Sequence, residues 1–340
     1  MKYLALSLLV ALGIGCAKEK PQFQTIGSVE RLDPRMDKLI PKDAQIEQIA
    51  EGFEWAEGPL WIKKGNYLLF SDVPNNVIHK WEDQPGNTEY TTYLQPSGYT
   101  GKTPRKGEPG SNGLTLDNDG RLTICQHGDR RVVRVEDDGK WTTLAAQFEG
   151  RRFNSPNDAV WDKEGNLYFT DPFYGLEGGI KDPAREIPYQ GVFRRAKNGN
   201  ITVLVKDVSR PNGIALSPDH KTLYVNNSDA NKAVCMAYDL KWDGTLSNPR
   251  VFFDVTPLAK AGNLKGLPDG LKVDNKGNVF ATGPGGVLVF DKDGTHLGTI
   301  NTGGKATANC AFGGADGSTL YMTADDVVCR VKTKTKGQGF

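Results

Sequence analysis

Hydrophobic and polar positions alternate along this chain in a unit that recurs six times. In the copy that begins at Asn157, "NDAVWDKEGNLYFTD", a polar residue precedes an alternating strand, then an Asp/Gly turn, then a second strand with aromatic residues. Alternation with a period of two predicts half-buried strands, and the Asp/Gly segments predict tight hairpin turns. The six copies begin at Glu57, Asn112, Asn157, Asn212, Asp269 and Asn309.

The spacing of the copies predicts the fold. Their first residues are 40 to 57 residues apart, and each copy is followed by further strand-like runs such as "RVVRV". A repeat of this length with about four short strands is typical of a propeller blade. We therefore predict an all-β fold, a six-bladed β-propeller over residues 46–335, in which residues 46–52 lend the last blade an outer strand and close the ring. A pair of β-sandwiches is the alternative, which six similar units in one row disfavour.

Four segments inside the copies, "DNDG", "DKEG", "DNKG" and "DKDG", look like pieces of calcium-binding loops. An EF-hand loop has glutamate at its twelfth position, but counting from Asp117 gives Gly128, and counting from Asp162 gives Phe173. We therefore interpret these segments as hairpin turns between the first two strands of each blade.

The polar residue that opens each copy points to a metal site. In a propeller the first strand of each blade lines the central channel, so these six residues, called ring residues below, should meet at one mouth of the channel. All six carry a side-chain oxygen, and two carboxylates placed together repel one another unless a cation lies between them. Oxygen ligands favour Ca²⁺, with Mg²⁺, Mn²⁺ or Zn²⁺ as alternatives. The competing interpretation is that each asparagine only closes a turn at the start of its own strand.

Long irregular segments are expected on the same side as the ring residues. Segments 96–111 and 256–268 lead into first strands, and segment 172–191 follows a second strand. Both kinds of connection lie on one face of a propeller, and binding residues collect on loops above a rigid scaffold. These loops carry Lys, Arg, Tyr and Gly, which suit a polar, oxygen-rich small molecule.

The N-terminal segment predicts export. One lysine is followed by an apolar run from Leu4 to Ile14, which is typical of a signal-peptide core and short for a membrane span. Cys16 follows in the context "GIGC", so residues 1–16 resemble a bacterial lipoprotein leader, with Gly13 where leucine is usual. We predict a periplasmic protein held at the membrane through lipidated Cys16, with plain export as the alternative. Residues 17–45 are then a polar tether.

Composition and missing motifs narrow the function. The net charge is +1 and no basic stripe occurs, which argues against nucleic acid as a partner. The motifs of serine esterases, zincins and P-loop enzymes are absent from the sequence. Only Cys310 and Cys329 are close enough in sequence to suggest a disulfide, and we interpret both, with Cys125 and Cys235, as buried thiols. A closed ring needs no partner, so we expect a monomer.

Five motifs occur in order along the chain. They are "EGP" at 57–59, "NSPND" at 154–158, "FTDPFYGL" at 169–176, "RPNGIALSPD" at 210–219 and "LPDGLKVD" at 267–274. With these motifs the chain resembles the gluconolactonase branch of the SMP-30/gluconolactonase/LRE-like family over most of its length. The resemblance implies a six-bladed propeller that hydrolyses lactones, or organophosphates in some relatives, with a divalent metal in the channel mouth. It assigns the metal ligands to Glu57, Asn157, Asn212 and Asp269.

The ring residues and this resemblance together suggest hydrolysis of a sugar lactone such as glucono-1,5-lactone. The metal would bind the lactone carbonyl oxygen and stabilise the oxyanion that forms when water attacks. The general base is Asp269, which resembles the family's catalytic aspartate, or Asp171, which ends a second strand at the same mouth. We expect Asn112, His127 and Tyr174 to contact the substrate. The alternatives are another metal-dependent esterase or phosphotriesterase, and a propeller that binds a ligand without catalysis.

Overall fold

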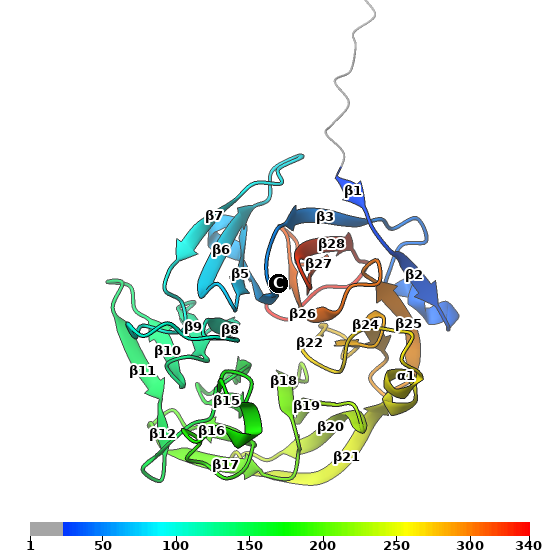
Figure 1. Cartoon of the computed structure of the whole chain (residues 1–340). Coiled ribbons are helices and arrows are strands. Elements are labelled where there is room, and N and C mark those ends of the chain that lie inside the picture. The colour runs from blue at the N-terminus through cyan, green and yellow to red at the C-terminus, as the bar shows by residue number, and fades with distance from the viewer. Residues whose placement is uncertain (1–22) are drawn as a thin grey trace, which may run out of the picture.

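The computed structural model describes residues 23–340 and shows a six-bladed β-propeller (Figure 1). Each blade is an antiparallel sheet whose first strand lies beside the central channel, and the blades follow one another in chain order around a ring. This confirms the fold predicted from the repeats. Among residues 23–340, no helix has the length and apolar character needed to cross a membrane.

The strands have the following bounds. Blade one comprises β4 (Ala56–Ile62), β5 (Tyr67–Asp72), β6 (Val77–Glu82) and β7 (Tyr90–Leu94). Blade two comprises β8 (Ser111–Leu116), β9 (Leu122–Gln126), β10 (Arg131–Val135) and β11 (Trp141–Ala145), followed by a small hairpin of β12 (Gln147–Phe148) and β13 (Arg151–Arg152). Blade three comprises β14 (Ala159–Trp161), β15 (Leu167–Asp171), β16 (Gly191–Arg195) and β17 (Ile201–Val205).

The other three blades follow the same order. Blade four comprises β18 (Pro211–Leu216), β19 (Thr222–Asp229), β20 (Lys232–Leu240) and β21 (Leu246–Asp254). Blade five comprises β22 (Leu271–Val273), β23 (Val279–Gly283), β24 (Gly286–Phe290), β25 (His296–Asn301) and β2 (Ser28–Arg31). Blade six comprises β26 (Thr307–Gly313), β27 (Thr319–Ala324), β28 (Val327–Lys332), β3 (Ile46–Glu51) and β1 (Gln24–Thr25). The helical turns are η1 (Pro34–Lys38), η2 (Lys63–Gly65), η3 (Gly179–Lys181) and the α-helix α1 (Thr256–Ala261).

Strand β3 closes the ring. It pairs antiparallel with β28, with Ile46 opposite Val331 and Glu51 opposite Val327. The last blade therefore takes an outer strand from the beginning of the propeller, as predicted for residues 46–52. Because β3 is followed directly by β4 of blade one, this pairing links the last blade to the first.

The predicted tether, residues 17–45, is wrong for its described part, because residues 23–45 belong to the propeller. β1 pairs with β3, and β2 pairs with β25 as a fifth strand of blade five. Met36, Leu39 and Ile40 lie in the apolar cluster between blades five and six. The signal peptide and Cys16 lie outside the described residues, so export and lipidation stay predictions.

Met36 offers a direct test of this docking. Its side chain is fully buried, and removing a buried methionine side chain leaves a cavity in a packed core. We expect Met36→Ala to lower the free energy of unfolding by about 2–5 kcal/mol, measured by urea denaturation. Leu32→Ala is the control, because Leu32 is 55% exposed and its loss should cost less than about 0.5 kcal/mol. Equal stabilities for the two variants would contradict the docking of this segment.

Apolar clusters between neighbouring blades hold the ring together. Between blades two and three, for example, Phe153, Phe169 and Phe193 pack with ring centroids 5.0 to 5.6 Å apart. The four cysteines among the described residues are free and buried, so the pair Cys310 and Cys329 is not bonded, in line with the buried-thiol interpretation.

The calcium-like segments are turns. The first aspartate of each segment caps its own hairpin: Asp117 Oδ1 accepts hydrogen bonds from the backbone N–H groups of Asp119 and Arg121, and Asp274 Oδ1 accepts from Lys276 and Asn278. This is the behaviour expected of an Asx turn. One detail of the prediction is wrong, because "DKDG" at 291–294 connects the outer strands β24 and β25 rather than the first two strands of a blade.

The C-terminal residues extend the propeller beyond the predicted boundary at 335. Gly337 forms a β-bridge with Asp274, and Gln338 Nε2 donates to the carbonyl oxygens of Leu216 and Val273. These residues draw the end of the chain to the centre of the ring (Figure 1). The tail therefore lies at the mouth of the channel opposite to the ring residues, where residues 337–340 form part of the wall of a cavity.

Candidate active site

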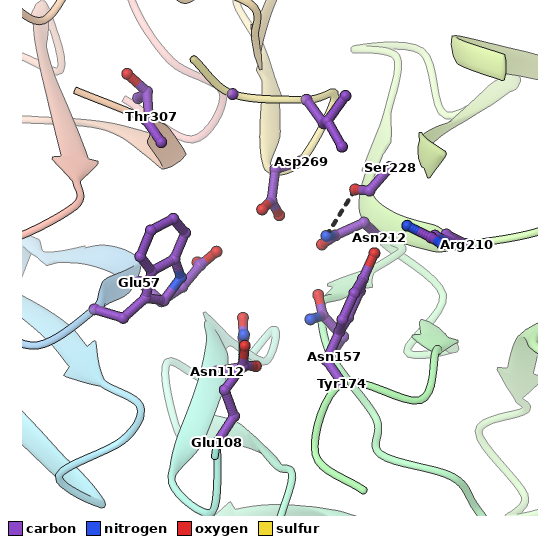
Figure 2. A pocket seen from close by; sticks show the side chains of 14 residues that line it. Glu57, Glu108, Asn112, Asn157, Tyr174, Arg210, Asn212, Ser228, Asp269 and Thr307 are labelled. Atoms are coloured by element: carbon purple, nitrogen blue, oxygen red, sulfur yellow. Dashed lines mark hydrogen bonds between the residues drawn. The ribbon is translucent and has the colours of Figure 1, made fainter. Parts of the chain in front are cut away.

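A cavity of about 330 Å³ lies at the mouth of the channel where the inner strands begin. Five of the six ring residues line it, and their side chains point toward one another (Figure 2). The lining residues are Trp55, Glu57, Glu108, Asn112, Asn157, Tyr174, Arg210, Asn212, Ser228, Gly266, Leu267, Asp269, Ala306 and Thr307. All three long segments expected at this mouth contribute, with Glu108 from 96–111, Tyr174 from 172–191, and Gly266 and Leu267 from 256–268.

Irregular pairing at the inner strands accompanies the ring residues. The register between the first two strands of a blade shifts between Glu57 and Leu60, and again between Pro211 and Ile214. A β-bulge bends its strand and re-aims a side chain. Glycine after a ring residue lets the next blade approach closely, because a Cβ on Gly113 would lie 2.6 Å from the carbonyl oxygen of Asn157.

Glu57 is the more deeply buried of the two ring carboxylates. It is 1% exposed, and its Oε2 accepts hydrogen bonds from the backbone N–H of Gly58 at 2.7 Å and from Asn309 Nδ2 at 3.2 Å. Burial raises the pKa of Glu57 to about 8, despite these two hydrogen bonds. Asn309 therefore supports Glu57 from behind instead of lining the cavity.

Asp269 is the second ring carboxylate. Its Oδ1 has no hydrogen-bond partner in the protein, while its backbone is held by Asn226 Nδ2, which donates to its carbonyl oxygen at 2.7 Å. Desolvation, and next the negative charge of Glu57, raise the pKa of Asp269 well above its ordinary value. A carboxyl group whose pKa is raised by a neighbouring carboxylate favours a cation between the two.

Two of the amides that line the cavity have side-chain oxygens without a hydrogen-bond partner. Asn112 Oδ1 and Asn157 Oδ1 are buried without any hydrogen-bond partner in the protein. Asn212 donates from Nδ2 to Ser228 Oγ at 2.9 Å, and Ser228 in turn donates to the carbonyl oxygen of Pro268. A buried oxygen that lacks a donor is costly, so a ligand of positive charge or a hydrogen-bond donor is expected at this place.

These residues fit a hard divalent cation. Within residues 23–340 no three His, Cys, Asp or Glu side chains come together as a metal-binding group, so amide oxygens must complete the ligand set. Glu57, Asn157, Asn212 and Asp269 supply two carboxylates and two amides at one cavity. An all-oxygen set of this kind matches Ca²⁺ or Mg²⁺ better than metals that prefer nitrogen or sulfur.

Of the residues predicted to contact substrate, Asn112 and Tyr174 line the cavity. His127 does not: its side chain is fully buried, and Nε2 lies 3.3 Å from Asn157 Nδ2, behind the ring. The prediction of a direct substrate contact by His127 is therefore corrected to a contact with a ring residue. The sequence position of His127 correctly predicted the mouth at which it lies, but not that Asn157 stands between His127 and the cavity.

Asp171 is also corrected. It is fully buried, and its two carboxylate oxygens accept hydrogen bonds from the backbone N–H groups of Asn154 and Ser155, each at 2.8 Å. It does not line the cavity, although burial raises its pKa to about 7. Asp171 therefore holds the segment before Asn157 in place and is badly situated to take a proton from water in the cavity.

Known proteins resemble this chain in sequence and in fold. A sequence profile of the SMP-30/gluconolactonase/LRE-like region matches residues 55–326 of the chain.

The chain belongs to this family.

A gluconolactonase from Zymomonas mobilis is 39% identical over 325 residues, which are 94% of this chain and 90% of the relative. The solved structure of a gluconolactonase from Xanthomonas campestris matches with a TM-score of 0.77 at 27% identity, over 93% of this chain and 99% of that chain. Regucalcin from Agrobacterium tumefaciens, a calcium-binding protein, matches with a TM-score of 0.64 at 21% identity, over 85% of this chain and 96% of that chain. At that identity the last likeness shows the fold alone.

Sequence reasoning missed several cavity residues in this family member. Glu108 adds a third carboxylate, Arg210 adds a cation, and Trp55 and Thr307 form part of the wall. None of them occupies the recurring ring position: Trp55 and Arg210 directly precede inner strands, Glu108 lies in a loop, and Thr307 begins β26 two residues before Asn309. The motif "RPNG" does contain Arg210 two residues before Asn212, and this was the one available signal.

Proposed function

We propose that this protein hydrolyses a sugar lactone such as glucono-1,5-lactone to the aldonic acid. We also propose that a divalent cation, with Ca²⁺ as the first choice, is held by Glu57, Asn157, Asn212 and Asp269. The proposal rests on one observation: two carboxylates of raised pKa and amide oxygens without protein partners meet at one cavity. The likeness to a gluconolactonase of 39% identity supports the choice of substrate.

In the reaction a water molecule attacks the carbonyl carbon of the lactone. A bound cation would supply Lewis-acid polarisation of the carbonyl group. Asp269 would take the proton of the water on its free Oδ1, which is the carboxylate oxygen without another partner. The bond between the carbonyl carbon and the ring oxygen then breaks, the ring oxygen takes the proton that Asp269 removed from the water and becomes a hydroxyl group, and the product is the open-chain acid.

Other cavity residues would bind and orient the sugar. The amide of Asn112 and the hydroxyl of Tyr174 can hydrogen-bond to ring hydroxyl groups, and Arg210 can attract the carboxylate of the product. Burial and the nearby charge of Asp269 raise the pKa of Tyr174 well above its ordinary value. The phenol therefore keeps its proton and can act as a donor at neutral pH.

The test is acid release from glucono-1,5-lactone, followed in a pH-stat and corrected for the rate without protein. We expect catalysis that a chelator abolishes and added Ca²⁺ restores. Catalysis that survives complete removal of divalent metal would contradict the proposed role of the cation. Hydrolysis of a phosphotriester without hydrolysis of any lactone would select the other hydrolase, and saturable lactone binding without turnover would select a binding propeller.

A further inference from the structure

The Asn157 amide contacts His127 through its nitrogen. Asn157 is 2% exposed, and its Nδ2 lies 3.3 Å from Nε2 of His127. The other end of the amide, Oδ1, belongs to a residue that lines the cavity and has no hydrogen-bond partner in the protein. The amide thus has one end committed to His127 and one end left for a ligand.

The chemistry of the two groups decides which end is which. An amide Nδ2 only donates hydrogen bonds, so Nε2 of His127 must accept, and the ring must then carry its proton on Nδ1. Nδ1 lies 3.3 Å from Oε2 of Glu108 without a hydrogen bond to it, and the negative charge of a carboxylate beside that nitrogen favours this tautomer. If the amide turned over, Oδ1 would face the lone pair of Nε2, and Nδ2 would face the cavity, where a cation would be repelled.

The surroundings hold the imidazole in place. His127 is fully buried, and a Cβ on Gly175 would lie only 2.5 Å from the Cβ of His127. Arg105 holds the two backbone segments beside His127 together, because its guanidinium donates to the carbonyl oxygens of Gly128 at 2.7 Å and Gly175 at 2.8 Å. The ring therefore has little freedom to move away from Asn157.

The amide nitrogen of Asn212 is likewise held by a hydrogen-bond acceptor, in this case Ser228. Its Nδ2 donates to Ser228 Oγ, and the proton of Ser228 is committed to the carbonyl oxygen of Pro268. The serine oxygen must therefore accept, and the Asn212 oxygen is left for the cavity. Two amides of the ring thus have a dedicated acceptor on the outer side.

We propose that His127 is a positioning residue, which, with Glu108 beside it, fixes the Asn157 amide with its oxygen toward the cation. This inference rests on the proposed function, because it assumes that Asn157 is a cation ligand. It assigns no substrate contact to His127. It predicts that removing the acceptor at position 127 weakens the binding of the cation first, and catalysis only as a consequence.

Calcium binding to full-length variants, measured by isothermal titration calorimetry, tests the proposal. We expect His127→Leu, which has no acceptor, to weaken Ca²⁺ binding on the order of 10–100-fold. His127→Gln, whose Oε1 can replace Nε2 as the acceptor, should stay within about tenfold of the wild type. His79→Leu is the matched control, because His79 packs among Phe53, Phe70 and Tyr90 in blade one, away from the cavity, and should bind like the wild type.

Kinetics separate positioning from general damage. At saturating Ca²⁺ the kcat of His127→Leu should approach that of the wild type, because the deficit lies in the occupancy of the site. Wild-type affinity in folded His127→Leu, or equal weakening in the leucine and glutamine variants, would overturn the proposal. If the wild type itself binds no Ca²⁺, the proposed cation fails instead, so the two failures are distinguishable.

A measurement on the unaltered protein covers the case in which His127→Leu does not fold. Long-range ¹H–¹⁵N NMR spectra distinguish the two imidazole tautomers, and the signal of His127 is assigned by its loss in His127→Gln. We expect the tautomer with the proton on Nδ1. The tautomer with the proton on Nε2 would overturn the proposal, because that nitrogen could not accept from Asn157.

Discussion

Asp269→Asn is expected to lower kcat/KM for glucono-1,5-lactone on the order of 10²–10⁴-fold, the usual contribution of a general base. The substitution keeps the size of the side chain and one oxygen but removes the negative charge and the proton acceptor at Oδ1, the atom that has no partner in the protein. It also removes one of two carboxylates at the cation site, so Ca²⁺ binding should weaken in parallel. Acid release and calorimetry measure the two effects.

Asp171→Asn is the matched comparison for this experiment. The chemical change is the same, but Asp171 accepts hydrogen bonds from the backbone N–H groups of Asn154 and Ser155 and does not line the cavity. We expect it to lower stability, because an amide N–H₂ group would face a backbone donor, while the folded variant keeps its kcat/KM within about tenfold. The reverse result, with activity lost in folded Asp171→Asn and kept in Asp269→Asn, would restore Asp171 as the base.

Calcium affinity is expected to fall steeply as the pH is lowered. Burial raises the pKa of Glu57 to about 8, so the carboxyl carries a proton in much of the metal-free protein at neutral pH. The cation binds the carboxylate and must displace that proton. Below pH 8 the dissociation constant for Ca²⁺ should therefore rise about tenfold for each pH unit and each displaced proton. The raised pKa of Asp269 acts in the same direction.

Titrations with Ca²⁺ between pH 6 and pH 9 measure this slope, and calorimetry in buffers of different ionisation enthalpy counts the protons released. Glu57→Gln is the control: its affinity should be low at every pH, with a flatter slope, because one of the two titrating carboxyl groups is gone. An affinity that does not change between pH 6 and pH 9 would contradict the prediction.

The same pKa of Glu57 has a consequence for stability. The folded value lies above the ordinary value of 4.5. A carboxyl of raised pKa stabilises the fold below its unfolded pKa, and this contribution disappears as the pH rises through the folded value. The metal-free protein should therefore lose stability between about pH 4.5 and pH 8, and Ca²⁺ should protect it most at the alkaline end of this range.

The blades were predictable because their information is local. A strand of period two, an Asp/Gly turn and a second strand occupy some fifteen residues of each copy, and alternation and turn chemistry do not depend on distant residues. Six aligned copies then identify equivalent positions, so that Asn157 and Asp269 were placed at one mouth although they are far apart in the sequence. The structure has both at the same cavity.

The errors fall where contacts are non-local. Residues 28–31 look polar, and they form β2 only because β25 offers an edge. Met36 is one apolar residue in a charged stretch, and its burial depends on a cluster between blades five and six. Nothing in the nearby sequence reports either partner, so the segment was predicted to be a tether.

The sequence by itself determined the repeat, the ring of side-chain oxygens and the family, because each follows from residues at recurring or matching positions. Only the tertiary structure decided which polar side chains reach the cavity. The loops that fold over the mouth bring Glu108 to the cavity wall. His127 lies behind Asn157, and Asp171 accepts a hydrogen bond from the backbone N–H of Asn154. The physical reason is that the direction of a side chain at the end of a strand depends on what packs against it, and here the packing comes from loops without a repeating pattern.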